Sequence, residues 1–249
     1  MILACSTCSF PRDRLEIAIA KVAWAGFRGI ELEFAGEPPA EEWLRERLRN
    51  NELVLVTIRA GELGAGDPEA TLARSAEIGR LAQLAHRLDA SRVVVTAPAH
   101  GEFAALTEGL RMLLDALQAI QSEVAVANAA GTLVATPDDL ARLRRAVPSP
   151  RHGFALDPAA AIRVGWDPAD ASHWPCRPTL VYLTDVRDGA TVPPGTGEVD
   201  WPRLAAVLRR AGFDGPIVLR LGGAPDYAVE PAAKEARVAA EEWFEIGWR

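Results

Sequence analysis

Residues 92–128 read RVVVTAPAHGEFAALTEGLRMLLDALQAIQSEVAVAN, two short apolar runs separated by a longer amphipathic stretch. The runs at 92–97 and 123–128 are almost continuously apolar, which is typical of parallel strands covered on both faces. The stretch between them is long enough for a helix that returns the chain to the start of the next strand. The segment therefore predicts a strand–helix–strand unit.

The rest of the chain repeats this unit. Helix starts are marked by Asp67 before Pro68, by Thr136 before Pro137 and by Asp200, and Pro11 is expected to begin the first helix. No G-x-G-x-x-G follows any strand, which disfavours the alternative of a doubly wound open sheet. Eight strands, each followed by a helix, predict one (β/α)₈ TIM barrel over residues 1–249. The expected strands are 2–5, 29–34, 53–58, 92–97, 123–128, 153–157, 179–185 and 216–221.

Composition excludes several classes of partner. The formal net charge of −7 disfavours nucleic acid, because phosphate binding needs a basic face. No apolar run reaches the roughly 18 residues that span a bilayer, so no membrane segment is expected. ILAC (2–5) resembles a lipoprotein cleavage box but lacks the basic and apolar regions that precede one. Cys5 and Cys8 have C-x-x-C spacing, yet Cys5 ends a strand, so we interpret both as reduced thiols of a cytoplasmic protein.

Four segments in order resemble the xylose isomerase-like barrels, the sugar-phosphate isomerase/epimerase family. They are AWAGFRGIELEF (23–34), ALDPAAAIRVGWDP (155–168), VYLTDVRDG (181–189) and GTGEVDWPRLAAVLRRAGFDGPIVLRL (195–221). The last is the most specific, because it resembles the family's passage into strand eight. The resemblance implies a barrel enzyme that acts on small polyols or sugar phosphates.

The resemblance also implies a divalent metal held by Glu, Asp, His and Glu at the ends of strands five to eight. At these positions the sequence has Ala127, Asp157, Tyr182 and Arg220. A divalent ion about 5 Å from a guanidinium would be repelled by roughly 7 kcal/mol at an effective dielectric near 20. We therefore expect no metal and no other cofactor, with Asp157 as the remnant of a metal ligand.

Arg220 has two alternative roles. In the first, it is the partner of Asp157 in a buried ion pair that fills the vacated metal site. Alternatively, it replaces the metal as an electrophile that holds a carboxylate, phosphate or enolate oxygen. Arg59, placed just past strand three, is either a second cation on the same face or a solvated loop residue.

Other candidates lie at the same end of the predicted barrel. Glu31 and Glu33 alternate on strand two and so share one face, which suits Glu33 as a base. His100, with Glu102 nearby, is a candidate acid or base, and Tyr182 a candidate proton donor. The loop 186–199 is a candidate lid. The expected substrate-binding residues are Arg59, Asn128, Glu31, Thr184, Gly222 and Gly223.

Two classes of function follow. The first is a metal-independent isomerase, epimerase or lyase acting on a small polar or anionic substrate, with Asp157, Arg220, Tyr182, Glu33 and His100 as catalytic candidates. The second is a non-catalytic barrel that acts as a binding protein or as the subunit of a partner or homo-oligomer. The sequence names no particular substrate, and fold alone does not choose between the two classes.

Overall fold

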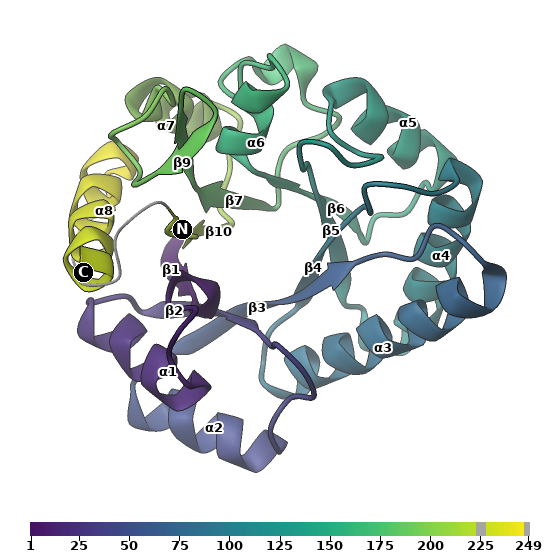
Figure 1. Ribbon diagram of the computed structural model, residues 1–249, viewed down its shortest axis with the longest axis horizontal. Helices are drawn as coiled ribbons and strands as arrows, with labels where there is room; N and C mark the ends of the chain where they lie inside the picture. The colour runs from purple at the N-terminus through teal and green to yellow at the C-terminus, as the bar shows by residue number, and fades with distance from the viewer. Residues whose placement is uncertain (223–227, 247–249) are drawn as a thin grey trace.

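A computed structural model describes residues 1–222 and 228–246 as a closed barrel of parallel strands surrounded by helices (Figure 1). The strand order around the barrel is β1-β10-β7-β6-β5-β4-β3-β2, and β8 pairs with β9 in a separate hairpin. The predicted TIM barrel is confirmed, and the open-sheet alternative is wrong. The barrel strands are β1 (Ile2–Ser6), β2 (Gly29–Glu33), β3 (Val54–Glu62), β4 (Arg92–Thr96), β5 (Glu123–Ala127), β6 (His152–Leu156), β7 (Leu180–Leu183) and β10 (Pro216–Leu219).

The helices begin where capping residues satisfy their first free N–H groups. Asp67, Thr136 and Asp200 each accept a hydrogen bond from the first turn of α3, α5 and α7, as predicted. Pro11 does not begin α1: it lies in a turn, and the helix starts at Leu15. The helices are α1 (Leu15–Trp24), α2 (Glu41–Asn50), α3 (Pro68–Arg87), α4 (Phe103–Ala116), α5 (Pro137–Ala146), α6 (Pro158–Arg163), α7 (Trp201–Arg210) and α8 (Val229–Phe244). In the part of the chain that the structure describes, no helix is both long and apolar enough to cross a membrane.

The barrel interior is built from small side chains. A buried cluster separate from the main core contains Tyr182 and Val218 together with four alanines, Ala4, Ala125, Ala127 and Ala155. Alanines leave space that larger side chains must fill if the interior is to reach normal packing density. Tyr182, fully buried, occupies that space, and charged side chains lie above it at the C-terminal ends of the strands.

The segment 186–199, which the sequence predicts as a lid, is held in place by hydrogen bonds to one carboxylate, that of Asp185. After β7, residues 185–192 form the hairpin of β8 (Asp185–Arg187) and β9 (Ala190–Val192), so the strand predicted for 179–185 is shorter than expected. Asp185 is fully buried and accepts hydrogen bonds from four backbone N–H groups and one indole. The donors are the N–H groups of Val186, Gly195, Gly197 and Val199 and the Nε1 of Trp201. Asp185 therefore holds both ends of the segment 186–199.

His152 makes the stability of the barrel sensitive to acid. It begins β6, is buried, and its Nδ1 lies 3.0 Å from the carbonyl oxygen of Val147. Burial lowers the pKa of His152, and the charge of Arg144 lowers it further. A histidine that is neutral when folded takes up a proton on unfolding, so stability is lost as pH falls below about 6.5.

We therefore expect the thermal midpoint of the protein to fall between pH 7.5 and pH 5.5, and to fall less in His152→Asn. His86→Asn, on an exposed position of α3, serves as the control and is expected to keep the wild-type pH dependence. An unchanged pH dependence in His152→Asn would contradict this prediction.

Candidate active site at the barrel mouth

Five charged or polar side chains meet at the C-terminal end of the barrel, where TIM-barrel enzymes place their active sites. We call them the arginine cluster: Glu31, Glu33, Arg59, Tyr182 and Arg220. Glu31 and Glu33 alternate on β2, Arg59 pairs in register with Glu33 on β3, and Tyr182 lies beside Val218 on β7. Arg220 directly follows β10. Neighbouring strand ends thus bring the cluster together.

Each member of the cluster contacts at least two others. Arg220 Nη2 lies 3.1 Å from Glu33 Oε2, and its Nε lies 3.9 Å from Glu31 Oε1. Arg59 Nη1 donates to the Tyr182 hydroxyl at 2.9 Å, and that hydroxyl donates to Glu31 Oε2 at 2.9 Å. Both guanidinium groups also lie over the Tyr182 ring, 5.3 and 5.4 Å from its centroid. The predicted shared face of Glu31 and Glu33 is confirmed by their common partner, Arg220.

Exposure rises from the barrel axis outward. The side chain of Glu31 is 0% exposed, and those of Arg220 and Glu33 are 22% and 33% exposed. Burial raises the pKa of Glu31 against the lowering effect of the two arginines. Burial also raises the pKa of Tyr182 well above its ordinary value, so the phenol stays protonated. Glu33 and Arg220 form the outer edge of the cluster, which is its most solvent-exposed part.

Arg59 corrects one prediction. Its side chain is 12% exposed, and the residue belongs to β3, which continues to Glu62 instead of ending at Ile58. Arg59 Nε lies 4.0 Å from Glu33 Oε2, so one carboxylate oxygen of Glu33 faces both arginines. Arg59 is therefore not a solvated loop residue: it lies beside Glu33 and Tyr182, on the same face of the barrel as Arg220.

Cys8 belongs to the same site and was not among the predicted site residues. Its Sγ accepts a hydrogen bond from Arg220 Nε at 3.2 Å. Burial raises the pKa of the Cys8 thiol, although Arg220 opposes this effect, so the thiol is not an activated nucleophile. The signal that could have indicated it is its position two residues beyond β1, at the same end of the barrel.

Asp157 lies in a second, separate set of polar residues. Its carboxylate accepts hydrogen bonds from the Thr184 hydroxyl at 2.6 Å and from Ala160 N at 3.0 Å, which caps α6. Asn128 uses both ends of its amide on the backbone of Asp157. No ion pair joins Asp157 to Arg220 in residues 1–222 and 228–246. The predicted Arg220–Asp157 pair is therefore wrong, because each group has nearer partners.

The remaining candidates lie outside both sets. His100 is exposed between β4 and α4, and no hydrogen bond to Glu102 is formed. Gly222 approaches Thr191 of β9 so closely that an added Cβ would lie 2.6 Å from its methyl group. Gly223 lies outside the described residues. Within the described part of the chain, neither His100 nor Gly222 forms a hydrogen bond or ion pair with the arginine cluster.

The donor set at the family's metal positions does not fit a divalent cation. Ala127 offers no donor atom, Tyr182 gives its proton to Glu31, and Arg220 carries a positive charge at the centre of the site. No group of three or more His, Cys, Asp or Glu side chains arranged to hold a metal occurs among the described residues. What the cluster can hold instead is an anion, because guanidinium groups bind carboxylate and phosphate oxygens.

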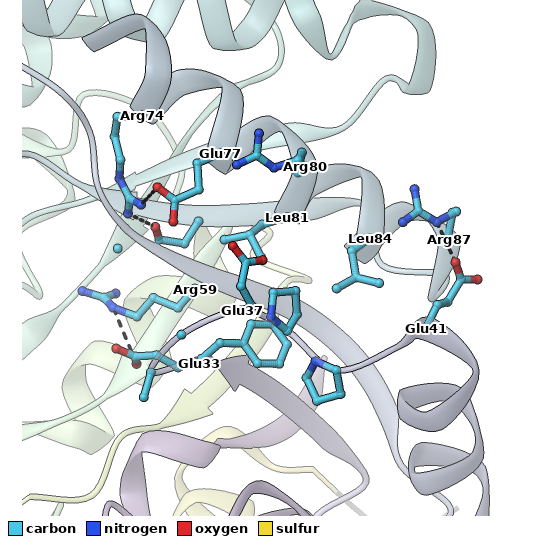
Figure 2. A pocket seen from close by; sticks show the side chains of 17 residues that line it. Glu33, Glu37, Glu41, Arg59, Arg74, Glu77, Arg80, Leu81, Leu84 and Arg87 are labelled. Carbon is cyan, nitrogen blue, oxygen red and sulfur yellow. Dashed lines mark hydrogen bonds and ion pairs between the residues drawn. The ribbon is translucent and has the colours of Figure 1, made fainter. Parts of the chain in front are cut away.

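A cavity of about 630 Å³ opens beside the cluster, between the loop 34–40 and α3 (Figure 2). Arg59 and Glu33 form one end of it, and Arg87 and Glu41 the other. A smaller cavity of about 440 Å³ lies on the other side of the same loop and is lined by Cys8 and Glu33. Glu33 therefore borders both cavities.

Comparison with solved structures supports the architecture at low sequence identity. The chain resembles a xylose isomerase domain protein from Alicyclobacillus acidocaldarius at 18% identity and a TM-score of 0.83, covering 99% of each chain. A D-psicose 3-epimerase matches at 15% identity and a TM-score of 0.79, covering 98% of this chain and 99% of the epimerase. The probable 3-DHS dehydratase AsbF from Bacillus anthracis matches at 17% identity and a TM-score of 0.77. This match covers 96% of the present chain and 99% of the dehydratase.

No curated protein sequence matches the chain. A family description nevertheless covers most of it: residues 19–245 match the xylose isomerase-like TIM barrel. The matched region contains every member of the arginine cluster as well as Asp157. With its closed eight-stranded barrel, the chain thus belongs to the xylose isomerase-like TIM barrel family.

Proposed function

We propose that the chain binds a small organic anion between Arg59 and Arg220 and transfers a proton on it without a metal, as an isomerase, epimerase or lyase. The observation that carries this proposal is the position of Glu33. One of its oxygens faces both guanidinium groups, at 3.1 and 4.0 Å, while its side chain stays one-third exposed. A pair of arginines that already holds one carboxylate at the mouth has the geometry to hold a substrate anion there.

The proposed chemistry uses Glu33 as the base. Its carboxylate takes a proton from a carbon next to a carbonyl or carboxylate group, and the electron pair of that C–H bond moves onto the oxygen held by a guanidinium. Where the deprotonated carbon carries a hydroxyl group, that group passes its proton to the former carbonyl oxygen and Glu33 returns its proton to the former carbonyl carbon, which gives an isomer. Protonation of the original carbon from its other face by water, with Glu33 releasing its proton to solvent, gives an epimer. Transfer of the proton from Glu33 to a hydroxyl group on the next carbon, which then leaves as water while the electron pair forms the new double bond, completes a lyase reaction.

Tyr182 and Glu31 act as positioning residues in this proposal. The protonated Tyr182 hydroxyl accepts from Arg59 and donates to Glu31, which fixes Arg59 in one orientation. Because Tyr182 is fully buried and uses its proton on Glu31, we assign it no direct proton transfer to substrate. This role differs from the proton donor predicted from the sequence.

The second candidate is a non-catalytic binding protein. It is favoured by the ion pair between Arg220 and Glu33, because this pair engages the carboxylate that would have to act as the base. In both cases the anion displaces Glu33 from the guanidinium groups, but only an enzyme must then place the freed carboxylate of Glu33 against a C–H group of the substrate. Measurement of binding and proton transfer on the same samples distinguishes the two.

The test is exchange of substrate hydrogen with solvent. The protein is incubated in D₂O with 2-hydroxy acids, 2-oxo acids and ketose phosphates, with EDTA present, and loss of C–H signals is followed by proton NMR. We expect exchange in at least one class, and a fall of about 100-fold in Glu33→Gln, the size typical of a lost general base. Anion affinity should rise in this variant, because Glu33 no longer competes for the arginines.

Glu46→Gln, an exposed carboxylate on α2, is the matched control and is expected to exchange at the wild-type rate. Exchange that appears only in a parallel sample without EDTA, or full exchange in Glu33→Gln, would overturn the proposed mechanism. Binding without exchange across the panel would leave the binding protein as the function.

We also propose a cytoplasmic location, which is supported by the three cysteines being free thiols. Self-association, or assembly with a partner subunit, stays a prediction of the sequence.

A further inference from the structure

The short turn after β1 lies between two strand ends that carry members of the arginine cluster. In the barrel, β1 has β10 on one side and β2 on the other (Figure 1). Its last pairs with these neighbours are Cys5 with Leu219 and Ser6 with Glu31. Beyond these pairs the neighbouring chains need other partners on the β1 side, because buried backbone N–H and C=O groups are rarely left unpaired.

Thr7 supplies such a partner for the end of β2. Its Oγ1 accepts a hydrogen bond from Glu33 N at 3.0 Å and lies 3.3 Å from the carbonyl oxygen of Glu33. Thr7 is only 5% exposed, so its hydroxyl group takes the place of the missing strand. The backbone of Glu33 is therefore held at both its N–H and its C=O group by one side chain.

Ser9 and Cys8 do the same for the chain that leaves β10. Ser9 is 1% exposed, and its Oγ accepts a hydrogen bond from Leu221 N at 3.0 Å and lies 3.5 Å from the carbonyl oxygen of Leu219. These two groups flank Arg220 on either side. Cys8 Sγ accepts from Arg220 Nε at 3.2 Å. One turn thus holds both the backbone around Arg220 and its guanidinium group.

We propose that the turn Thr7–Ser9 is the element that positions the anion site, with Thr7 setting the base, Glu33, and Ser9 setting the cation, Arg220. Glu33 Oε2 and Arg220 Nη2 lie 3.1 Å apart, and the two hydroxyl groups hold the backbones that carry this pair. The inference rests on the proposed function and adds the residues that set its geometry. Neither hydroxyl group is needed to touch the substrate, so both belong to positioning residues.

The two hydroxyl groups should affect different measurements, because Glu33 moves the proton and Arg220 holds the anion. Thr7→Val keeps the shape of the side chain but lacks the hydroxyl group. We expect it to slow hydrogen exchange at saturating substrate about tenfold and to keep the acetate Kd within about twofold of the wild-type value. Ser9→Ala is expected to raise the acetate Kd at least about threefold, because Arg220 is less firmly placed. Acetate is titrated by NMR, and the substrate is the panel compound that exchanges fastest with the wild type.

Amide hydrogen exchange tests the hydrogen bonds themselves and needs no substrate. The amide of Glu33 should exchange at least about tenfold faster in Thr7→Val, and that of Leu221 at least about tenfold faster in Ser9→Ala. Thr7→Ser, which keeps the hydroxyl group, should recover most of the protection of Glu33 and most of the substrate exchange.

Ser75→Ala is the matched control for loss of a buried hydroxyl group. Ser75 is 3% exposed on α3, and its Oγ lies 3.0 Å from the carbonyl oxygens of both Thr71 and Gly109, away from the barrel mouth. Its removal should change neither the acetate Kd nor substrate exchange. Thermal melting verifies that each variant is folded.

The outcomes separate this inference from the proposed function. Equal changes in Thr7→Val, Ser9→Ala and Ser75→Ala would overturn the inference, because a general loss of stability would explain them. Wild-type amide exchange of Glu33 in Thr7→Val would overturn it as well. If acetate does not bind the wild type, the anion site is overturned and the inference with it. If acetate binds but no substrate exchanges, only the proposed catalysis is overturned, and the acetate Kd of Ser9→Ala against that of Ser75→Ala still decides whether the turn positions Arg220.

Discussion

Asp185→Ala is expected to lower the free energy of unfolding by about 4 kcal/mol. The substitution leaves four backbone N–H groups and one indole N–H without their acceptor, at distances that are now 2.9 to 3.3 Å. Hydrogen bonds to a charged group contribute about 1.5–3 kcal/mol each, and buried donors left unpaired cost about 1–3 kcal/mol each. Water that enters the vacated space recovers part of this, so the loss is smaller than the sum.

Chemical denaturation measures the change, with Asp214→Ala as the control. Asp214 is exposed and meets Arg177 only at 3.9 Å, so its removal should cost less than about 0.5 kcal/mol. Gly197→Ala tests the same contact from the other side, because an added Cβ would lie 2.2 Å from Asp185 Oδ1. Both Asp185→Ala and Gly197→Ala should speed hydrogen exchange in residues 186–199. Wild-type exchange there would contradict the anchoring role.

The barrel could be predicted because its signals are local. Continuous apolar runs mark strands that are buried on both faces, and Asp67 and Thr136 mark helix starts by the hydrogen bonds that they accept. The positions where the strands end were harder to predict. The apolar run of β3 stops at Ile58, so the sequence predicts Arg59 just past the strand, whereas backbone pairing continues to Glu62. Polar side chains at the mouth interrupt the apolar pattern without interrupting the strand.

The partner of Asp157 was predicted wrongly although the sequence carries the relevant signal. LDPAAA (156–161) repeats the arrangement of GDPEAT (66–71), with an aspartate before a proline at a helix start. In both places the carboxylate accepts a hydrogen bond from the first turn of the helix. A capping role for Asp157 follows from this pattern, and it leaves Arg220 to pair with Glu33.

Contacts between elements that are distant in the sequence could not be predicted from local sequence patterns. Strand order places β10 two positions from both β6 and β2, so Arg220 is as many strands from Asp157 as from Glu33. Side-chain direction and competing partners decide between them, and neither is encoded in a local pattern. The cavity of about 630 Å³ depends on the path of the loop 34–40 against α3, which no periodicity predicts.

Arg220→Ala is expected to lower the free energy of unfolding by about 3 kcal/mol and to weaken anion binding at least tenfold. Arg220 is a close cation of Glu31, whose side chain is 0% exposed and whose Oε1 has no hydrogen-bond partner. Removing one member of a buried ion pair costs about 3–5 kcal/mol, and the partial exposure of Arg220 places the loss at the lower end. Arg28→Ala, which breaks an exposed pair with Glu52, is the control and should cost less than about 1 kcal/mol.

The pH dependence of this loss identifies Glu31 as its cause. Burial already raises the pKa of Glu31, and removal of Arg220 should raise it further. An acid whose pKa is raised on folding lowers stability as pH rises above its unfolded value, near 4.5. The deficit of Arg220→Ala should therefore be larger at pH 8 than at pH 5. In Arg220→Ala/Glu31→Gln the extra loss at pH 8 should disappear, since no charge is left buried. A deficit that is the same at both pH values would show that Arg220 stabilises the barrel through packing on Tyr182 and not through Glu31.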